Sequence, residues 1–445
     1  MTHAPTRLAR LRSEMRASAV LAAPLVFGQL ASMAMGIVDT VLAGRHGAVT
    51  LAAVGVGSAM WSITILVSIG VLMAIPPSVA QLNGAGRRAE IGPLFRQSLW
   101  LAGLLGLGLF AVVRGAPELL APMGVEPAIV PAATAFLHAI SWGAPAFALQ
   151  LALRNLSEGI GWTRPTMIFG LGGLVLLVPL GAWLMFTRGL GAAGLGYATA
   201  IVLWAQALGF YGYLRLDPHY RDLALFARFD GPHWAPIRAL LALGLPMGVS
   251  IFMEGSLFVA TALLIARLGT VPIAAHQIAV LFASLTFMVP LGVAMATTVR
   301  VGHAAGAGDA SAVRWAGAAG YALAAIAQLG AIALMLFGGA WLATLVTSDA
   351  AIAALATTLL GYAAVFQIPD GAQALSNGAL RGLKDTRVPM AITVLAYWGV
   401  GLPLGAWLGL GRGLGAPGLW VGLIFGLTVA ASLLALRFWR LARRR

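Results

Sequence analysis

The chain has 445 residues, of which 60% are hydrophobic and 9% are charged. Soluble domains carry about 25% charged residues, so this composition excludes a soluble enzyme, a disordered chain and a peripheral protein with one anchor. The sequence has no cysteine, which excludes disulfide frameworks, thiolate metal sites and cysteine nucleophiles. The net charge of +14 requires no nucleic-acid partner, because cytoplasmic loops of membrane proteins collect Arg and Lys.

Long apolar segments separated by short polar ones predict twelve membrane-spanning helices, since a spanning helix needs about 20 residues. Only helices or closed barrels satisfy the backbone in lipid, and the alternating pattern of barrel strands is absent. The predicted spans are residues 17–43, 51–79, 94–114, 129–153, 166–187, 192–214, 239–266, 273–299, 315–345, 352–379, 388–410 and 416–436.

These spans predict a cytoplasmic segment 1–16, a six-helix bundle 17–214, a cytoplasmic loop 215–238, a second six-helix bundle 239–436 and a basic cytoplasmic tail 437–445. With the N-terminus inside, 23 of the 28 basic residues lie in cytoplasmic segments and 5 lie outside. This asymmetry predicts that both termini are cytoplasmic. We expect a multi-pass protein of the cytoplasmic (inner) membrane.

The two halves of the sequence are repeats. Thirteen of the 17 residues from Pro179 to Leu195 recur, at an offset of 224, between Pro403 and Leu419. Six spans per half give both halves the same orientation, which predicts parallel repeats around a central cleft. Such repeats are typical of transporters, although some channels and membrane enzymes also arose by duplication.

Two glycine motifs could be mistaken for nucleotide-binding loops. Gly189–Gly194 and Gly413–Gly418 match G-x-G-x-x-G, but that fingerprint needs a preceding strand in a soluble βαβ unit. We interpret both as tight extracellular turns between spans. The sequence also lacks a Walker A loop, so it has no ATP-hydrolysing site of its own.

Of the 14 acidic residues, eleven, including Glu158, fall in segments that we predict to be solvated. The other three are Asp39 in span 1, Glu254 in span 7 and Asp370 in span 10. A charge at mid-membrane costs about 2.5–3.5 kcal/mol, and no Arg or Lys is predicted to share the membrane core with these three. We therefore interpret them as candidates for proton or cation binding; the alternative is a protonated carboxyl group satisfied by its neighbours.

Glu254 and Asp370 have similar predicted depths, and two nearby carboxylates can share a proton or hold a cation together. Asp39 is nearer the outer end of its span. The repeat aligns Glu254 with Ser32 and Asp39 with Thr261. Each pair within a half is seven residues apart, on one helix face, which we expect to line a cavity.

Several motifs together carry a family resemblance. They are Pro246–Glu254 with Ala274–Gln277, Val299–His303 with Gly306, Phe366–Gln373 with Gly378–Asp385, and Val38–Thr40 with Ala43–Gly44. Through them the chain resembles the multidrug and toxic compound extrusion family, NorM type, over essentially its full length.

The resemblance implies a cation-coupled exporter with six plus six helices and an outward-opening cleft. Glu254 and Asp370 match the carboxylates associated with the coupling ion, so they are also the candidate Na⁺ ligands. Asp39 matches an aspartate associated with proton or substrate binding. Two positions depart from the pattern: Phe366 stands where close relatives carry Tyr, and Leu177–Gly181 lacks the asparagines that often surround its proline.

Met and aromatic side chains re-pack readily around varied ligands. The candidates for lining a substrate cavity are Ser32, Met33, Phe252, Met253, Thr261, Phe282, Phe287, Phe366 and Gln373.

The sequence thus predicts a secondary active multidrug antiporter that exchanges Na⁺ or H⁺ for amphipathic, often cationic compounds by rocker-switch alternating access. We expect no enzymatic activity, no cofactor besides the coupling ion, no nucleic-acid partner and a monomer in the lipid bilayer. One alternative is a lipid-linked precursor flippase of the same superfamily, which predicts basic residues in the cavity. The other is an intramembrane enzyme that uses Glu254 and Asp370 as an acid–base pair and alters its substrate chemically.

Overall fold

The computed structural model describes residues 7–444, which form helices and turns with no strand. Eleven of the described helical segments are long and apolar enough to cross a membrane, and a bent pair can make a twelfth. The bent pair consists of Val130–Ser141 (α5) and Ala144–Gly159 (α6), which meet at 45°. The predicted all-helical membrane fold is therefore confirmed.

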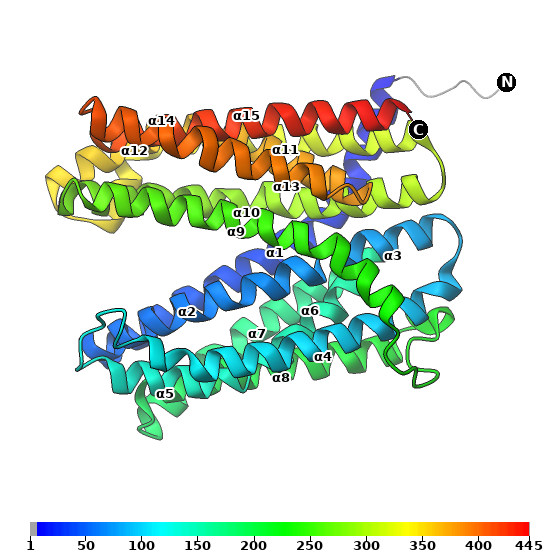
Figure 1. Cartoon of the computed structure of the whole chain (residues 1–445), viewed down its shortest axis with the longest axis horizontal. Coiled ribbons are helices and arrows are strands. Elements are labelled where there is room, and N and C mark those ends of the chain that lie inside the picture. The colour runs from blue at the N-terminus through cyan, green and yellow to red at the C-terminus, as the bar shows by residue number, and fades with distance from the viewer. Residues whose placement is uncertain (1–6, 445) are drawn as a thin grey trace. The chain divides into compact units, whose positions relative to one another are not determined.

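The chain divides into two compact units (Figure 1): Phe27–Gly248 forms one, and Val249 onward, together with the start of the chain up to Val26, forms the other. We call these the N-unit and the C-unit. Both boundaries lie inside helices, α1 (Arg7–His46) and α9 (Trp234–Ala266). The domain bounds predicted from the sequence remain a proposal.

The N-unit contains the end of α1 and the beginning of α9. Between them lie α2 (Ala48–Leu72), α3 (Ile75–Gly84), η1 (Arg88–Glu90), α4 (Ile91–Gly115), η2 (Ala116–Leu119), α5, α6, α7 (Arg164–Ala182), η3 (Trp183–Thr187), α8 (Gly191–Leu216) and η4 (Pro218–Leu223). Helix α8 packs against α5, α6 and α7, and α4 packs against α6. Phe136 and Phe95 are buried in the two main apolar clusters of this unit.

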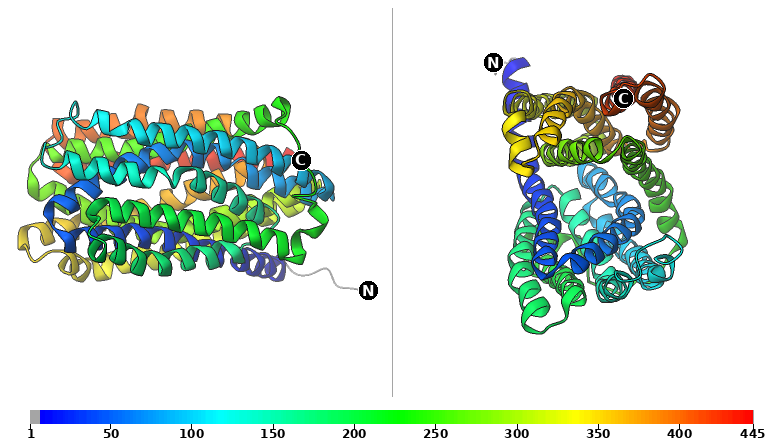
Figure 2. Two further views of the ribbon diagram at one scale, coloured as in Figure 1. Left: turned by 90° about the horizontal axis from the view of Figure 1, so that it is seen from below. Right: turned by 90° about the vertical axis from the view of Figure 1, so that its left-hand side faces the viewer.

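The C-unit contains the rest of α9. It continues with α10 (Thr270–Gly306), α11 (Ala310–Val346), α12 (Ala350–Gly382), α13 (Arg387–Val394), η5 (Leu395–Gly401), α14 (Leu402–Ala406), η6 (Trp407–Gly411) and α15 (Gly415–Arg444). Helix α12 packs along α10, α11 and α15, so it is the central helix of the unit; Figure 2 gives two further views of these helices. The first turns of α1 also belong here, because Leu25 packs with Val293 and Leu375, and Glu14 forms an ion pair with Arg300.

The segment between α8 and α9 is folded onto the beginning of α4. The Arg96 guanidinium forms an ion pair with Asp230 at 2.6 Å and donates to the Ala224 carbonyl at 2.9 Å. The Gln97 side-chain amide donates to Gly231 O and its oxygen accepts from the backbone N–H of His233. These bonds make the segment an ordered part of the N-unit.

The repeated outer turns adopt the same local structure in both halves. Segments η3 and η6 are π-helical, and each ends with an arginine over a tryptophan ring: Arg188 over Trp183 at 4.7 Å and Arg412 over Trp407 at 4.9 Å. The glycines that follow have positive φ, 68° at Gly189 and 72° at Gly413. Glycine adopts this backbone conformation without steric cost. The G-x-G-x-x-G motifs are therefore tight turns.

Helix α12 ends in a left-handed turn. Its cap is Leu383, and the next residue, Lys384, has φ of 60° and donates its backbone N–H to the Arg381 carbonyl at 2.8 Å. This residue is exposed. A left-handed residue after a helix satisfies carbonyl groups of the last turn, which fixes where α12 stops.

Candidate functional site

Helices α9 and α12 carry the two candidate carboxylates. Glu254 lies on α9, eight residues after Pro246, and Asp370 lies on α12 directly after Pro369. A proline inside a helix removes a backbone hydrogen bond and bends the helix. Asp370 is buried and Glu254 is partly buried.

The structure brings Glu254 and Asp370 together with Gln373. The Gln373 side-chain amide, which is 1% exposed, donates to the Glu254 carboxylate at 3.3 Å. Glu254 and Asp370 lie within electrostatic range of each other. Gln373 is one helical turn after Asp370, so α12 presents an amide and a carboxyl group to the same region of α9.

A basic residue also lies near this pair, which corrects one step of the sequence interpretation. Arg381 follows residue 379, where span 10 is predicted to end, so the sequence places it in a cytoplasmic segment and predicts no basic partner in the membrane core. Helix α12 continues to Gly382, and Arg381 lies within electrostatic range of Glu254.

Further polar side chains are buried on the same helix. The Gln367 amide donates to the Thr286 hydroxyl on α10 at 2.8 Å, and the Gln328 amide on α11 donates to the Gln367 carbonyl. The side-chain oxygen of Gln367 is buried without a hydrogen-bond partner. A buried polar atom without a partner costs about 1–3 kcal/mol, so such atoms mark places where water or a ligand would be accommodated.

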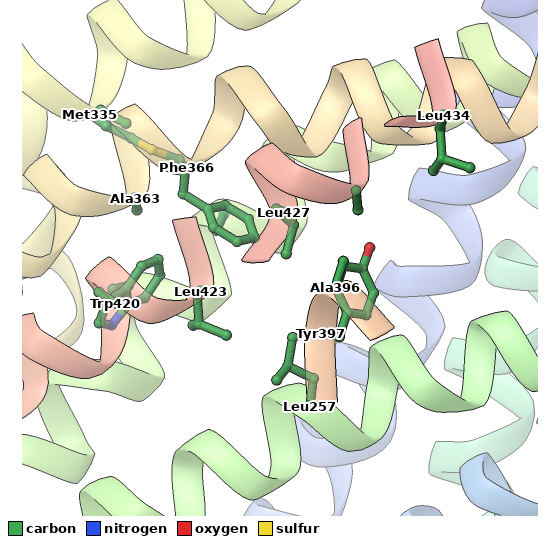
Figure 3. Packing of buried hydrophobic residues seen from close by; sticks show 14 of the residues in the cluster. Leu257, Met335, Ala363, Phe366, Ala396, Tyr397, Trp420, Leu423, Leu427 and Leu434 are labelled. Atoms are coloured by element: carbon green, nitrogen blue, oxygen red, sulfur yellow. The ribbon is translucent and has the colours of Figure 1, made fainter. Parts of the chain in front are cut away.

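Aromatic side chains pack together one helical turn before Asp370. Phe366, which is 2% exposed and one turn before Asp370, makes edge-on contacts with Phe258 at 5.9 Å and Trp420 at 5.7 Å. Figure 3 shows Phe366 and Trp420 among the buried residues of this unit, and Leu257 and Tyr397 belong to the same cluster. The apolar surroundings lower the local dielectric, which strengthens every charge interaction inside them.

Asp39 lies in the N-unit and is not part of this cluster. Its carboxyl group is partly buried on α1, and its Oδ1 has no hydrogen-bond partner. Its role in proton or substrate binding stays a prediction.

The proposed cavity residues have diverse environments. Ser32 is exposed and donates to Gly28 O, Met33 and Met253 are partly buried, and Phe252 is 46% exposed. Phe282 and Phe287 pack against two different apolar clusters of the C-unit. Thr261 and Phe366 are buried. Of this set, Gln373 is the one that hydrogen-bonds a candidate carboxylate, and the substrate-binding role of all of them stays a prediction.

The prediction that Glu158 is solvated is wrong. Its side chain is buried on α6, where it forms an ion pair with Arg154 at 3.1 Å and accepts from the Thr166 hydroxyl at 3.0 Å. The helix continues to Gly159 and packs against α8, so the position lies inside the bundle. The i,i+4 spacing of Arg154 and Glu158 was a signal for this pair.

Comparisons with known proteins show what the chain is similar to. The MatE family model matches residues 24–183 and 246–407, one match in each half of the chain. "Probable multidrug resistance protein NorM" of Xanthomonas campestris pv. campestris is 51% identical over 444 residues, covering 99% of this chain and 97% of that protein. "Multidrug resistance protein PmpM" of Pseudomonas aeruginosa is 42% identical and covers 98% and 93%.

Solved structures show the same fold at low sequence identity. A structure described as the outward-facing conformation of a multidrug resistance MATE family transporter of the MOP superfamily is 20% identical, with a TM-score of 0.90 over 99% of this chain and 98% of that chain. The eukaryotic MATE transporter AtDTX14 is 18% identical, with a TM-score of 0.88 over 98% of each chain.

Proposed function

The chain belongs to the MatE family of multidrug efflux transporters, and from this premise we propose that it is an antiporter that exchanges Na⁺ or H⁺ for amphipathic, often cationic compounds. In this proposal the protein works as a monomer in the cytoplasmic membrane with both termini inside, and it needs no cofactor besides the coupling ion. The cycle is a rocker-switch form of alternating access.

The observation that carries the proposal is the pair of carboxylates, Glu254 and Asp370, inside one helical unit of an apolar chain. Removing a carboxylate from water is costly unless a cation neutralises it. Within residues 7–444, the basic group near this pair is Arg381, which interacts with Glu254. A proton or Na⁺ that enters this region therefore gains binding energy from both acids.

The coupling follows from competition for the same charges. An organic cation and an inorganic cation both favour ionised carboxylates, so binding of one disfavours the other. To drive the exchange, each of the two cations needs only to bind the inward-open and outward-open states with different affinities. Asp39 supplies, in this proposal, a further proton- or substrate-binding group in the N-unit.

We predict that Glu254→Gln and Asp370→Asn each abolish export while the protein still reaches the membrane. Each change keeps the shape of the side chain and removes its charge, so the cation loses its binding partner. Ethidium efflux from proteoliposomes under imposed Na⁺ or H⁺ gradients measures the effect and identifies the ion.

Glu126→Gln is the matched control, because Glu126 is an exposed acid outside the helices. It should export ethidium at the wild-type rate. Undiminished gradient-driven export by Glu254→Gln would contradict the proposed coupling role.

A further inference from the structure

Tyr397 is a buried phenol without a hydrogen-bond partner. Its side chain is 0% exposed, and its hydroxyl makes no hydrogen bond in the described structure. Buried hydroxyl groups are normally paired, because an unpaired one loses its bond to water without replacement. This hydroxyl is therefore suited to a partner that binds and leaves.

The backbone around Tyr397 is unusual and is fixed beside Glu254. The residue lies in η5, a π-helical segment, and such segments are frequent at functional sites. Its neighbour Trp398 donates its ring N–H to the carbonyl of Met253, the residue before Glu254, at 3.3 Å. This bond attaches η5 to the turn of α9 that carries the glutamate.

The Tyr397 side chain lies near both candidate carboxylates. Tyr397 lies within electrostatic range of both Glu254 and Asp370. In Figure 3 its ring lies close to Leu257, one turn after Glu254, and its hydroxyl is directed away from that leucine. The hydroxyl is thus a polar atom in an apolar cluster, near two acids.

The number of oxygen ligands around Glu254 and Asp370 determines which cation can bind there. Within residues 7–444, no group of three or more His, Cys, Asp or Glu side chains is placed to hold a metal ion. A metal cation at Glu254 and Asp370 therefore needs oxygens from other residue types. Hard cations take several oxygen ligands, whereas a proton binds to one carboxylate oxygen. Phe366, one turn before Asp370, offers none.

We propose that the Tyr397 hydroxyl is the third side-chain oxygen of a Na⁺ site whose other two donors are Glu254 and Asp370. The π-helical segment η5 carries this hydroxyl, and the Trp398–Met253 hydrogen bond holds η5 beside the turn that carries Glu254. This inference rests on the proposed cation-coupled function and names Na⁺ as the ion for which the site is built.

The test is Na⁺ binding to the purified full-length protein by titration calorimetry, with Tyr397→Phe as the variant. The substitution removes one oxygen and keeps the buried ring, so the fold should persist, which thermal unfolding checks. Losing a hydroxyl that contacts a charge weakens Na⁺ binding by about tenfold or more. Tyr362→Phe is the matched control, since Tyr362 packs against the same apolar cluster and should bind Na⁺ as the wild type does.

Proteoliposome export separates a ligand from a structural residue. For Tyr397→Phe, the half-saturating Na⁺ concentration should rise by about the same factor, while any export driven by H⁺ should remain. Equal Na⁺ affinity in Tyr397→Phe and wild type overturns the inference, as does a wild type that exports with H⁺ yet binds no Na⁺. The proposed function itself fails only if wild-type protein exports under neither gradient.

Discussion

A buried carboxylate needs a partner, and Glu158 has Arg154 one helical turn earlier on α6. The glutamate side chain is almost fully enclosed, and Thr166 on α7 supplies a further hydrogen bond. Replacing one member of such a pair leaves an uncompensated charge, which costs more than replacing both by apolar groups.

We predict that Arg154→Met destabilises the protein by about 3–5 kcal/mol. The double variant Arg154→Met, Glu158→Leu should recover most of that loss, because no buried charge is left alone. Chemical unfolding of the purified protein in detergent compares the two. A double variant as unstable as the single one would show that the pair contributes mainly through packing.

Single positions also show how far the sequence could predict the site. Glu254 and Asp370 could be found because acids are rare in this chain and costly in lipid. Tyr397 could not, because a phenol in an apolar span has no distinguishing pattern, and its placement depends on a π-helical turn that α-helical periodicity does not predict. Glu158 was missed because a polar residue near a span end is usually solvated.

At the scale of elements, the segment between α8 and α9 is held by side chains at the beginning of α4. The Arg96 guanidinium, hydrogen-bonded to Asp230, lowers the pKa of that carboxyl group below its ordinary value of 3.8. A lowered pKa means that the ionised form is favoured in the fold. The contact is therefore fully present at neutral pH and is lost as the pH falls through the lowered pKa.

We predict that Asp230→Asn increases deuterium uptake by backbone amides of residues 224–233 at neutral pH, because Arg96 loses its ion pair. In the wild type, uptake corrected for intrinsic exchange should be constant from pH 8 to pH 5 and rise only below about pH 3.8. Exchange followed by mass spectrometry measures both. Glu118→Gln changes an exposed acid and should leave this segment protected.

The elements themselves were largely predictable, and their ends were not. Hydropathy located the spans because lipid demands long apolar helices, and the repeat located the paired outer turns with their glycines. Hydropathy does not register the bend between α5 and α6, which both remain apolar. Nor does it show that residues 217–233 fold back onto α4, since that depends on contacts between residues over 100 positions apart.

For the whole molecule, the asymmetric distribution of arginines predicts which side of the membrane each loop occupies. Basic residues cross a membrane with difficulty, so the loops that hold most of them remain inside. The described helices agree with the number of spans, and the orientation stays a prediction.

We predict that Met123→Cys reacts with a membrane-impermeant thiol reagent in intact cells, whereas Phe229→Cys reacts only after permeabilisation. Both side chains are exposed, and the natural sequence has no cysteine, so each variant carries one thiol. Labelling of Phe229→Cys from outside would reverse the proposed orientation.

Lys384, the residue in the left-handed turn that ends α12, is the only lysine in the sequence. The protein therefore carries one ε-amine, and that amine is exposed. Above about pH 9, an amine-reactive fluorophore would attach to this one side chain and to the α-amine of the chain, without any change of sequence. It would report from the end of the same helix that carries Asp370 and Gln373, so ion binding could be followed optically in the natural protein.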